Sequence, residues 1–560
     1  MARKINYDNW SREELEKELR RIKETKYGLV WHRDLPEEKI DVLINPDART
    51  PSEMFPNEMT GRPFPVLKEV KTKEIKTDKT SPINLLIEGD NYHSLAVLNF
   101  THQETIDVIY IDPPYNTGNE DFIYNDRFVD VEDPYRHSKW LAFMEKRLKL
   151  AKNLLKPSGV IFISIDDNEQ AQLKLLCDEI FGYQNFIATL IWNKKNVVQN
   201  DAKYFSVNHE YIHCYGKNLG SVVFNLLPRT DEQNARYSNP DNDLRGDWTS
   251  VALQAKSGSE NNLYEITFPN GVKWKPVAGT FPRLNKESLL RAYNEGRLWF
   301  GKNGKNVPRL KKYLNEVKQG VVSNSILLPD DVGSTQLAKE TLKKILNENI
   351  FETPKPIELI KRFIRFNSNK EGLILDFMAG SGTTGHAVLE MNKEDNGNRQ
   401  FILCTNNENN ICTNVCYPRL KKVIKGYRNT KSENIAGLGG NLKYYSCDFV
   451  EAEPTDRNKR KLVNESTEML CIKESAFELV QGEGDFKIFK NSDKYLGIIF
   501  YEEAIDAFKK AIKKIDGHFN TYVFSLGDDP HEKQFADVKS KVTLCAIPEV
   551  ILKVYKEIFK

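Results

Sequence analysis

The sequence lacks the features that would place it in several common classes of protein. No apolar run approaches the ~18 residues that a membrane-spanning helix needs, and the opening "MARKINYDNWSREELEKELRR" has charges but no apolar signal-peptide core. The eight cysteines form no C-x₂-C pair, which argues against structural zinc and suits a reducing compartment. We find no P-loop of the G-x₄-G-K-[ST] type and no nuclease cluster. The sequence therefore predicts a cytoplasmic protein with no membrane or metal partner and no cleavage activity of its own.

Positive and negative charges nearly balance over the whole sequence, although one stretch is basic. The 560 residues carry a net charge of +2, and a composition with 40% hydrophobic and 29% charged residues indicates a globular protein of several domains. Between Ile191 and Asp330, 20 Lys and Arg residues stand against 13 Asp and Glu residues, with aromatics among them. This stretch is either a solvated basic surface or a nucleic-acid-binding one. On the second interpretation, the candidate DNA-binding residues are Lys194, Lys195, Arg236, Arg245, Trp248, Lys302, Lys305, Lys311 and Lys312.

Short apolar runs that each end in an acid indicate the strands of a parallel sheet. "INLLIEGD", "IDVIYID" and "GVIFISID" follow this pattern, and a helix whose apolar face runs from Trp140 to Leu155 joins the second to the third. Strand and helix patterns in alternation predict an α/β domain with helices on the faces of the sheet. The alternation stops at about residues 199–335 and resumes in "GLILDFMAGSGTTGHAVLEMN".

Two loops at predicted strand ends have residues suited to binding. "IYIDPPYNTG" interrupts a strand with an acid, two prolines and an aromatic, which is either ordinary loop punctuation or a rigid clamp for a planar ligand. "LILDFMAGSGTTGHAVLE" ends a strand at Asp376, turns at its glycines and starts a helix near Thr383, where free N–H groups can meet a carboxylate or a phosphate. Because ligands collect at the carboxyl ends of parallel strands, we expect both loops to face one crevice.

These loops carry a resemblance to a known family. "DPPY" is similar to the catalytic loop of the amino-group DNA methyltransferases, and "DFMAGSGTT" to their S-adenosylmethionine loop, in the order typical of the beta group. With "NLLIEGDN", "FISIDDNE", "FETPKP" and "NNENNICTNVCYPRLKKVIKGY", the chain from about residue 83 onward resembles the modification (Mod) subunit of type III restriction-modification systems. The resemblance implies an α/β, Rossmann-like parallel-sheet methyltransferase domain, split by an inserted target-recognition domain and extended at both ends.

The resemblance also implies roles for matching residues. Asp112 and the Pro113 carbonyl would accept the two hydrogens of the amino group of a flipped-out base, Pro114 would stiffen the loop, and Tyr115 would stack on the base. The residues expected to hold S-adenosylmethionine are Asp90, Asp112, Lys355, Asp376, Phe377, Gly380, Ser381, Gly382, Thr383 and Glu408. After "FILC" many relatives have an acid for the cofactor ribose, whereas this chain has Thr405-Asn406-Asn407, so the ribose contact stays open between Glu408 and an asparagine.

The expected domain order follows from the same motifs. It consists of an N-terminal helix and connecting arm (1–80), the catalytic half of the methyltransferase domain (81–198), a target-recognition domain (199–335), the cofactor-binding half (336–430) and a C-terminal mixed α/β domain (431–560).

The leading hypothesis for function is sequence-specific transfer of a methyl group to the N6 amino group of adenine in duplex DNA. The resemblance implies a homodimer that can recruit a restriction subunit carrying helicase and nuclease activities. Two alternatives stay open: methylation of the N4 amino group of cytosine, and a role as the DNA-recognition subunit of a nuclease complex. The aspartate before Pro-Pro favours adenine by resemblance alone.

Overall fold

A computed structural model of the chain describes residues 62–118, 129–348, 350–451 and 455–547, except residues 79, 131, 483, 492–493 and 526–530, and also a few isolated positions. The N-terminal helix predicted within residues 1–80 lies almost entirely outside them. The chain divides into two compact units, Met1–Phe224 with Ser325–Lys560 (the main unit) and Asn225–Asn324 (the inserted unit). Within the described residues, no helix has the length and apolar character needed to cross a membrane.

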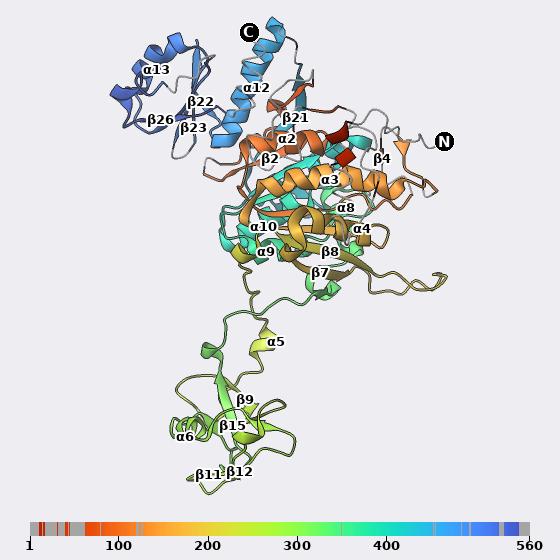
Figure 1. The fold of residues 1–560 in the computed structure, drawn as a ribbon, viewed down its shortest axis with the longest axis vertical. Helices are drawn as coiled ribbons and strands as arrows, with labels where there is room; N and C mark the ends of the chain where they lie inside the picture. The colour runs from red at the N-terminus through yellow and green to blue at the C-terminus, as the bar shows by residue number, and fades with distance from the viewer. Residues whose placement is uncertain are drawn as a thin grey trace. The chain divides into compact units, whose positions relative to one another are not determined.

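The main unit is built on one sheet with the strand order β1-β21-β2-β18-β17-β3-β6-β8-β7-β16 (Figure 1). The six strands from β21 to β6 run parallel, whereas β8 runs antiparallel to both of its neighbours, β6 and β7. The strand bounds are β1 Phe64–Glu69, β2 Ile83–Glu88, β3 Ile106–Ile111, β6 Leu155–Ile165, β7 Phe186–Asn193, β8 His209–Gly216, β16 Ile326–Leu327, β17 Leu373–Asp376, β18 Gln400–Thr405 and β21 Asn441–Val450.

The centre of this sheet contains a topological switch point. Strands β17 and β3 are neighbours, with Leu375 opposite Ile109, although far apart in the chain. From β17 the chain continues through a helix to β18 on one side, and from β3 through a helix to β6 on the other side. Diverging connections of this kind leave a crevice at the carboxyl ends of the two strands. The prediction that the loops after Asp112 and Asp376 face one crevice is therefore confirmed at the level of the fold.

Helices cover both faces of the sheet, because successive residues of a buried strand point to opposite sides. In β3, Ile109 packs in the core that contains α2 and α3, whereas Tyr110 stacks on Phe363 of α9, with 5.7 Å between ring centroids. The helix bounds in the main unit up to residue 425 are α2 Asn91–Thr101, α3 Arg136–Leu154, α4 Gln170–Cys177, α7 Pro329–Val332, α8 Thr335–Leu346, α9 Ile357–Asn367, α10 Thr383–Asp395 and α11 Tyr417–Lys425.

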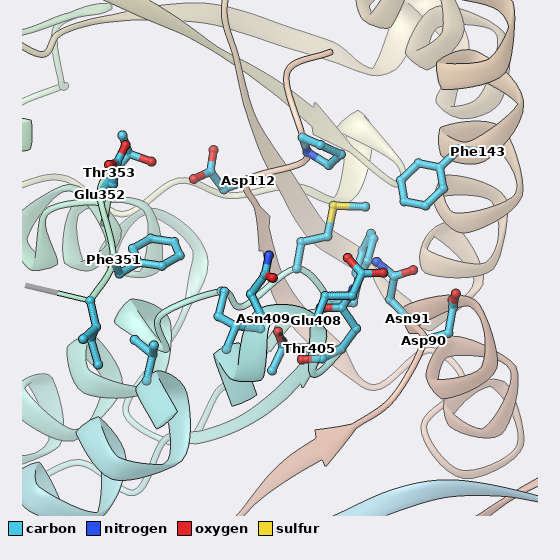
Figure 2. A pocket seen from close by; sticks show the side chains of 18 residues that line it. Asp90, Asn91, Asp112, Phe143, Phe351, Glu352, Thr353, Thr405, Glu408 and Asn409 are labelled. Carbon is cyan, nitrogen blue, oxygen red and sulfur yellow. Dashed lines mark hydrogen bonds between the residues drawn. The ribbon is translucent and has the colours of Figure 1, made fainter. Parts of the chain in front are cut away.

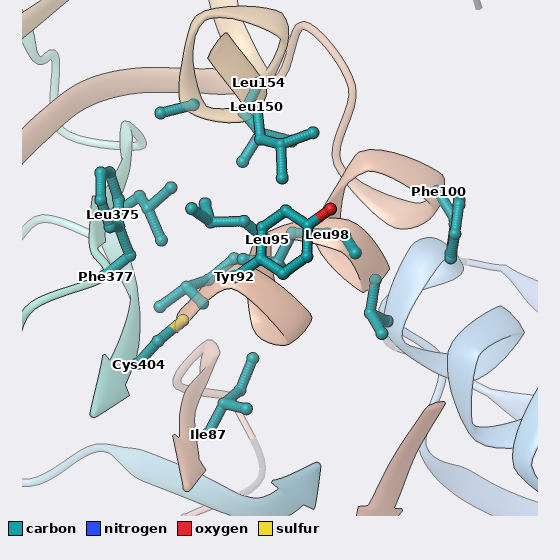
Figure 3. Packing of buried hydrophobic residues seen from close by; sticks show 14 of the residues in the cluster. Ile87, Tyr92, Leu95, Leu98, Phe100, Leu150, Leu154, Leu375, Phe377 and Cys404 are labelled. Carbon is teal, nitrogen blue, oxygen red and sulfur yellow. The ribbon is translucent and has the colours of Figure 1, made fainter. Parts of the chain in front are cut away.

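The packing of α2 and α3 against the sheet fixes the carboxyl ends of β2 and β17. Figure 3 shows Leu95 and Leu98 of α2 between Leu150 of α3 and the strand residues Ile87 and Leu375. The predicted apolar face of α3 is confirmed, since the side chains in question are all fully buried: Trp140, Met144, Leu148, Ala151 and Leu155. The last of these already belongs to β6.

The inserted unit has its own small core. Its strands β9 (Trp248–Ala252), β14 (Leu298–Trp299) and β15 (Arg309–Tyr313) form an antiparallel sheet in the order β14-β15-β9, and α6 (Lys286–Asn294) supplies Leu289 and Ala292 to the core. The interval 199–335 with altered composition is longer than this unit, because β8 lies inside that interval and pairs within the main sheet.

The C-terminal part of the main unit adds a second sheet, with the order β22-β23-β24-β25-β26. Its elements are α12 Asp456–Glu474, β22 Glu478–Gln481, β23 Phe486–Lys490, β24 Tyr495–Ile499, α13 Ile505–Ile512, β25 Phe519–Val523 and β26 Val542–Cys545. Strand β21, which begins after residue 440, belongs to the main sheet and not to this one.

Candidate functional site

A cavity of about 600 Å³ lies at the carboxyl ends of β2, β3, β17 and β18, a size typical of small-molecule sites. Its lining residues are Asp90, Asn91, Asp112, Pro114, Phe143, Ile350, Phe351, Glu352, Thr353, Phe377, Met378, Gly380, Thr405, Asn406, Glu408, Asn409, Ile411 and Val415. Four of them are carboxylates and none is Lys or Arg, so the cavity wall favours a ligand with positive charge.

One end of the cavity is polar and is built by the ends of β2 and β18. Figure 2 shows Asp90 and Asn91 near Glu408, with Phe351 and Asp112 farther along the cavity. Asp90 caps α2 by accepting a hydrogen bond from the Tyr92 amide, and Arg147 of α3 donates to the same carboxylate at 3.0 Å. Burial alone would raise the pKa of Asp90, but the Arg147 guanidinium holds it below its ordinary value. Asp90 is therefore an ionised acceptor at this end.

The loop at residues 376–383, which we call the glycine loop, has some residues that line the cavity and others that hold the loop in place. Phe377 and Gly380 line the cavity, and Gly380 has a φ of +49°, in the left-handed region that favours glycine. The other predicted residues of this loop, Asp376, Ser381, Gly382 and Thr383, are not among the lining residues. Instead, the buried Arg419 of α11 donates to Ser381 Oγ at 3.1 Å and to Thr383 Oγ1 at 2.8 Å. The part of the loop from Ser381 onward is thus held from behind by an arginine that sequence reasoning missed.

Asp376 organises the same loop from inside the protein. Its carboxylate accepts hydrogen bonds from the Met378 amide at 3.0 Å and from the Thr384 hydroxyl at 2.5 Å. Burial raises the pKa of Asp376 to about 7, although these hydrogen bonds oppose the shift. The fold therefore contains a carboxyl group whose ionisation near neutral pH costs stability.

We expect Asp376→Asn to stabilise the ligand-free protein, increasingly so at high pH. A carboxyl whose folded pKa lies above its unfolded value binds more protons when folded, so wild type loses stability as the pH rises from about 4 to above 7. The asparagine does not ionise. The difference in free energy of unfolding between variant and wild type should grow by about 2.5 kcal/mol from pH 5 to pH 8 in urea titrations. A difference independent of pH would contradict this account.

Two residues of the catalytic loop, Asp112 and Tyr115, meet two side chains from elsewhere in the chain, Glu210 and Lys355, and we call these four residues the Asp112 network. Lys355 Nζ lies 2.6 Å from Asp112 Oδ2 and 3.4 Å from Glu210 Oε2. The Tyr115 hydroxyl lies 2.8 Å from Asp112 Oδ1 and 3.0 Å from Glu210 Oε2, and because it has one hydrogen it donates to one carboxylate at a time. Lys355, predicted to help hold S-adenosylmethionine, is buried in this network and is not among the residues that line the cavity.

The charges in the network are unequal. Burial raises the pKa of Asp112 above its ordinary value, Lys355 opposes the shift, and Glu210 adds to it. Burial would also raise the pKa of Glu210, but Lys355 and Lys194 together hold it below its ordinary value. Lys194 Nζ lies 3.0 Å from Glu210 Oε1. Glu210 is therefore the ionised anchor of the two lysines, and Asp112 is the carboxylate that more readily accepts a proton.

Glu210 was absent from the sequence-based site, and the strand direction explains why. It lies at the start of β8, which runs antiparallel to β6, so its first residues lie at the same edge of the sheet as the carboxyl ends of the parallel strands. The sequence "NHEYIHCY" gives no sign of this direction. The direction of β8 is known only from its pairing with β6 and β7, so no local signal in the sequence identifies Glu210.

Further side chains hold the backbone of the catalytic loop. The Trp140 indole donates to the Pro114 carbonyl at 2.7 Å, and Asn116, with a φ of +57°, donates to the buried Glu169 at 2.6 Å. Glu169 also pairs with His137 at 2.7 Å. The loop is thus fixed from α3 on one side and from the carboxyl end of β6 on the other.

The predicted DNA-binding residues fall into three groups. Arg236, Lys302, Lys305 and Lys312 are exposed on the inserted unit, and Lys194 and Lys195 are half-buried on the main unit. The side chains of Arg245, Trp248 and Lys311 are instead engaged within the inserted unit. Lys311 is 5% exposed and pairs with Asp241 and Asp243, Arg245 pairs with Asp243, and the Trp248 indole donates to Asp241.

The strand order, the switch point and the cavity define a doubly wound, Rossmann-like α/β domain with a ligand site at the carboxyl ends of its strands. The DNA methylase family matches residues 106–415, which is more than half of the chain and includes both loops. The chain belongs to this family.

Individual relatives are named as type III Mod subunits and type II methyltransferases. The StyLTI Mod subunit of Salmonella typhimurium is 36% identical over 61% of this chain and 55% of its own length. The EcoPI Mod subunit of Escherichia phage P1 is 33% identical over 71% of both chains, and the methyltransferase M.KpnI of Klebsiella pneumoniae is 32% identical over 65% of this chain and 88% of its own length. Similarity to the StyLTI subunit thus spans about half of that protein.

Among solved structures, the cytosine-N4-specific PvuII DNA methyltransferase matches 58% of this chain and 85% of its own, with 12% identity and a TM-score of 0.32.

Proposed function

We propose that this protein transfers a methyl group from S-adenosylmethionine to the N6 amino group of adenine in duplex DNA, as the modification subunit of a restriction-modification system. The observation that carries the proposal is the Asp112 network beside a cavity lined by carboxylates, in a chain of the DNA methylase family. Relatives named as Mod subunits support the assignment to a restriction-modification system.

The cavity suits S-adenosylmethionine. The sulfonium and ammonium groups of this cofactor outweigh its single carboxylate, so it has a net positive charge. Asp90 and Glu408 would hold the polar nucleoside end, Phe143 and Phe351 offer apolar contact, and Gly380 leaves the wall open for close approach. When bound, the cofactor supplies an electrophilic methyl group. Thr405, Asn406 and Glu408 all line the cavity, which supports a ribose contact from this short stretch.

The Asp112 network supports the expected role of the catalytic loop and adds one for Glu210. An adenine amino group is a poor nucleophile because its lone pair is delocalised into the ring. Two acceptors for its hydrogens, the Asp112 carboxylate and the Pro113 carbonyl, favour the tetrahedral nitrogen that attacks. Lys355 and Tyr115 each occupy one acceptor position on an Asp112 oxygen, and Glu210 lies close enough to receive either donor when the amino group takes its place.

Proton release also falls to Asp112. Methyl transfer leaves the amino nitrogen with a positive charge and two hydrogens, one of which must go. Because its pKa is raised by burial, Asp112 is better suited than Glu210 to take this proton. When Asp112 then releases this proton to solvent, its carboxylate can pair with Lys355 again.

The inserted unit is the proposed target-recognition domain, with Arg236, Lys302, Lys305 and Lys312 as its candidate phosphate contacts. Arg245, Trp248 and Lys311 support its fold. A homodimer and a restriction subunit complete the proposed assembly, and the relatives' names, which describe Mod subunits of restriction-modification enzymes, support the second of these.

We expect Gly380→Asp to abolish cofactor binding. The residue lines the cavity, and a Cβ there would meet Phe351 at 3.6 Å, so there is room for the substitution while its carboxylate enters the ligand space. Affinity for S-adenosylmethionine, measured by calorimetry, should fall about 100-fold or more.

The matched control is Gly439→Asp. Gly439 also has a positive φ, +81°, and has open space around it, so a side chain there is likewise strained by a left-handed backbone but does not enter the cavity. Its variant should bind the cofactor as wild type does. If Gly380→Asp retains wild-type affinity, the cofactor site lies elsewhere.

A further inference from the structure

The connection between β7 and β8, residues 194–208, exposes a group of large apolar side chains. We call this segment the β7–β8 loop. Tyr204 and Phe205 are 79% and 89% exposed, and Val197, Val198 and Val207 are exposed on the same loop. Large apolar side chains gathered on an exposed segment are typical of a surface that binds a macromolecule or another ligand.

The loop begins and ends beside the Asp112 network. The Lys194 amide donates to the Asn208 carbonyl at 2.8 Å, which closes the base of the loop, and the Lys194 ammonium pairs with Glu210. Glu210 in turn lies within hydrogen-bonding distance of Tyr115. Figure 1 shows the loop extending beyond the ends of β7 and β8. Its exposed side chains therefore project from the edge of the sheet that carries the catalytic loop.

The loop is internally ordered and has positive charge. The Gln199 amide donates to Ser206 Oγ at 2.9 Å, and that hydroxyl donates to Asn208 Oδ1 at 2.7 Å, which links the two arms. The segment contains three lysines and one aspartate, and Lys203 lies 5.1 Å from the Tyr204 ring. Aromatic rings combined with lysines fit stacked bases flanked by phosphates better than they fit a purely apolar partner.

We propose that the β7–β8 loop inserts Tyr204 and Phe205 into the DNA base stack beside the target, filling the space left when the target base leaves the duplex for the Asp112 loop. This inference rests on the proposed methylation of duplex DNA. A base reaches a site of this kind only when it is extruded, and extrusion removes its stacking and pairing. Apolar side chains that enter the stack offset part of that loss, as in proteins that insert wedges between base steps.

The test compares two duplexes that contain the methylated sequence, one with a paired target base and one with an abasic position opposite the target. Single-turnover methylation is measured with the full-length wild type and with Tyr204→Ala/Phe205→Ala. On the paired duplex the double variant should react about 10-fold to 100-fold more slowly. On the abasic duplex, where no pairing is lost, its rate should stay within about threefold of wild type.

Two further variants isolate the cause. Tyr183→Ala removes a tyrosine that is also 79% exposed but precedes β7, at the opposite end of that strand, and it should leave both rates unchanged. Tyr204→Phe/Phe205→Tyr keeps both rings and should retain the wild-type rate on the paired duplex. Calorimetry with S-adenosylmethionine should give the same affinity for every variant, which separates this test from a failure of the cofactor site.

Other results overturn the inference. Equal losses on both duplexes would make the loop a general contact surface, and wild-type rates on both would leave it without a role in extrusion. A double variant that sediments as a smaller species than wild type would make the loop an interface between protein chains. If wild type itself methylates neither duplex, the proposed function fails and not the loop assignment alone.

Discussion

Replacing Asp112 by asparagine should reduce methyl transfer roughly 100-fold to 1000-fold. The substitution keeps the shape of the side chain but replaces one acceptor oxygen with a donor. It removes the negative charge that stabilises the positive charge developing on the amino nitrogen. It also removes the group that takes up the released proton. Lys355 keeps Glu210 as a partner, so the network does not lose its cation. The measurement is single-turnover transfer from labelled cofactor to duplex DNA.

A matched control lies at the other end of the same strand. Glu104 precedes β3 and pairs with Lys217 on the surface, so Glu104→Gln should leave the transfer rate unchanged. Duplex affinity of Asp112→Asn should stay within a few-fold of wild type, because the extruded base is the only part of the DNA that Asp112 would contact. Activity at a tenth of wild type or more would remove Asp112 from the mechanism.

Exchanging the inserted unit, residues 225–324, for the matching segment of a relative should change the DNA sequence that is methylated while leaving the modified base the same. The unit has its own core and its own sheet, so it can be exchanged without cutting the main sheet. Exchange over the longer interval 199–335 would remove β8 and with it Glu210. Genome-wide mapping of methylated positions in cells that carry each chimera measures the outcome.

The competing assignment places recognition in the C-terminal part of the main unit. The control chimera therefore replaces residues 456–545, from α12 to β26, and should keep the wild-type sequence preference. An unaltered preference after exchange of 225–324, together with a changed one after exchange of 456–545, would transfer the recognition role to the C-terminal part.

Much of the fold was predictable because its signals are local. Apolar runs ending in acids predict β2, β3 and β6, and the rule that ligands gather at the carboxyl ends of parallel strands predicts that the loops after Asp112 and Asp376 face one crevice. The helix beginning at Thr383 was likewise predictable from the glycines that precede it.

The parts that sequence could not supply depend on distant pairing. Composition treats Lys311 and Lys312 alike, yet on β15 they point to opposite sides, so that Lys312 is exposed while Lys311 pairs with Asp241 and Asp243. Lys355 matched a family motif, but its partner Glu210 comes from an antiparallel strand that no local pattern revealed.

The central claim, methylation of adenine N6 by the Asp112 loop, is tested most directly by single-molecule sequencing of host DNA from three strains. One lacks the gene, one carries the wild-type gene, and one carries Asp112→Asn. The account predicts N6-methyladenine at a single sequence motif in the wild-type strain and its absence from the other two. N4-methylcytosine at the motif, or N6-methyladenine that persists with Asp112→Asn, would contradict it.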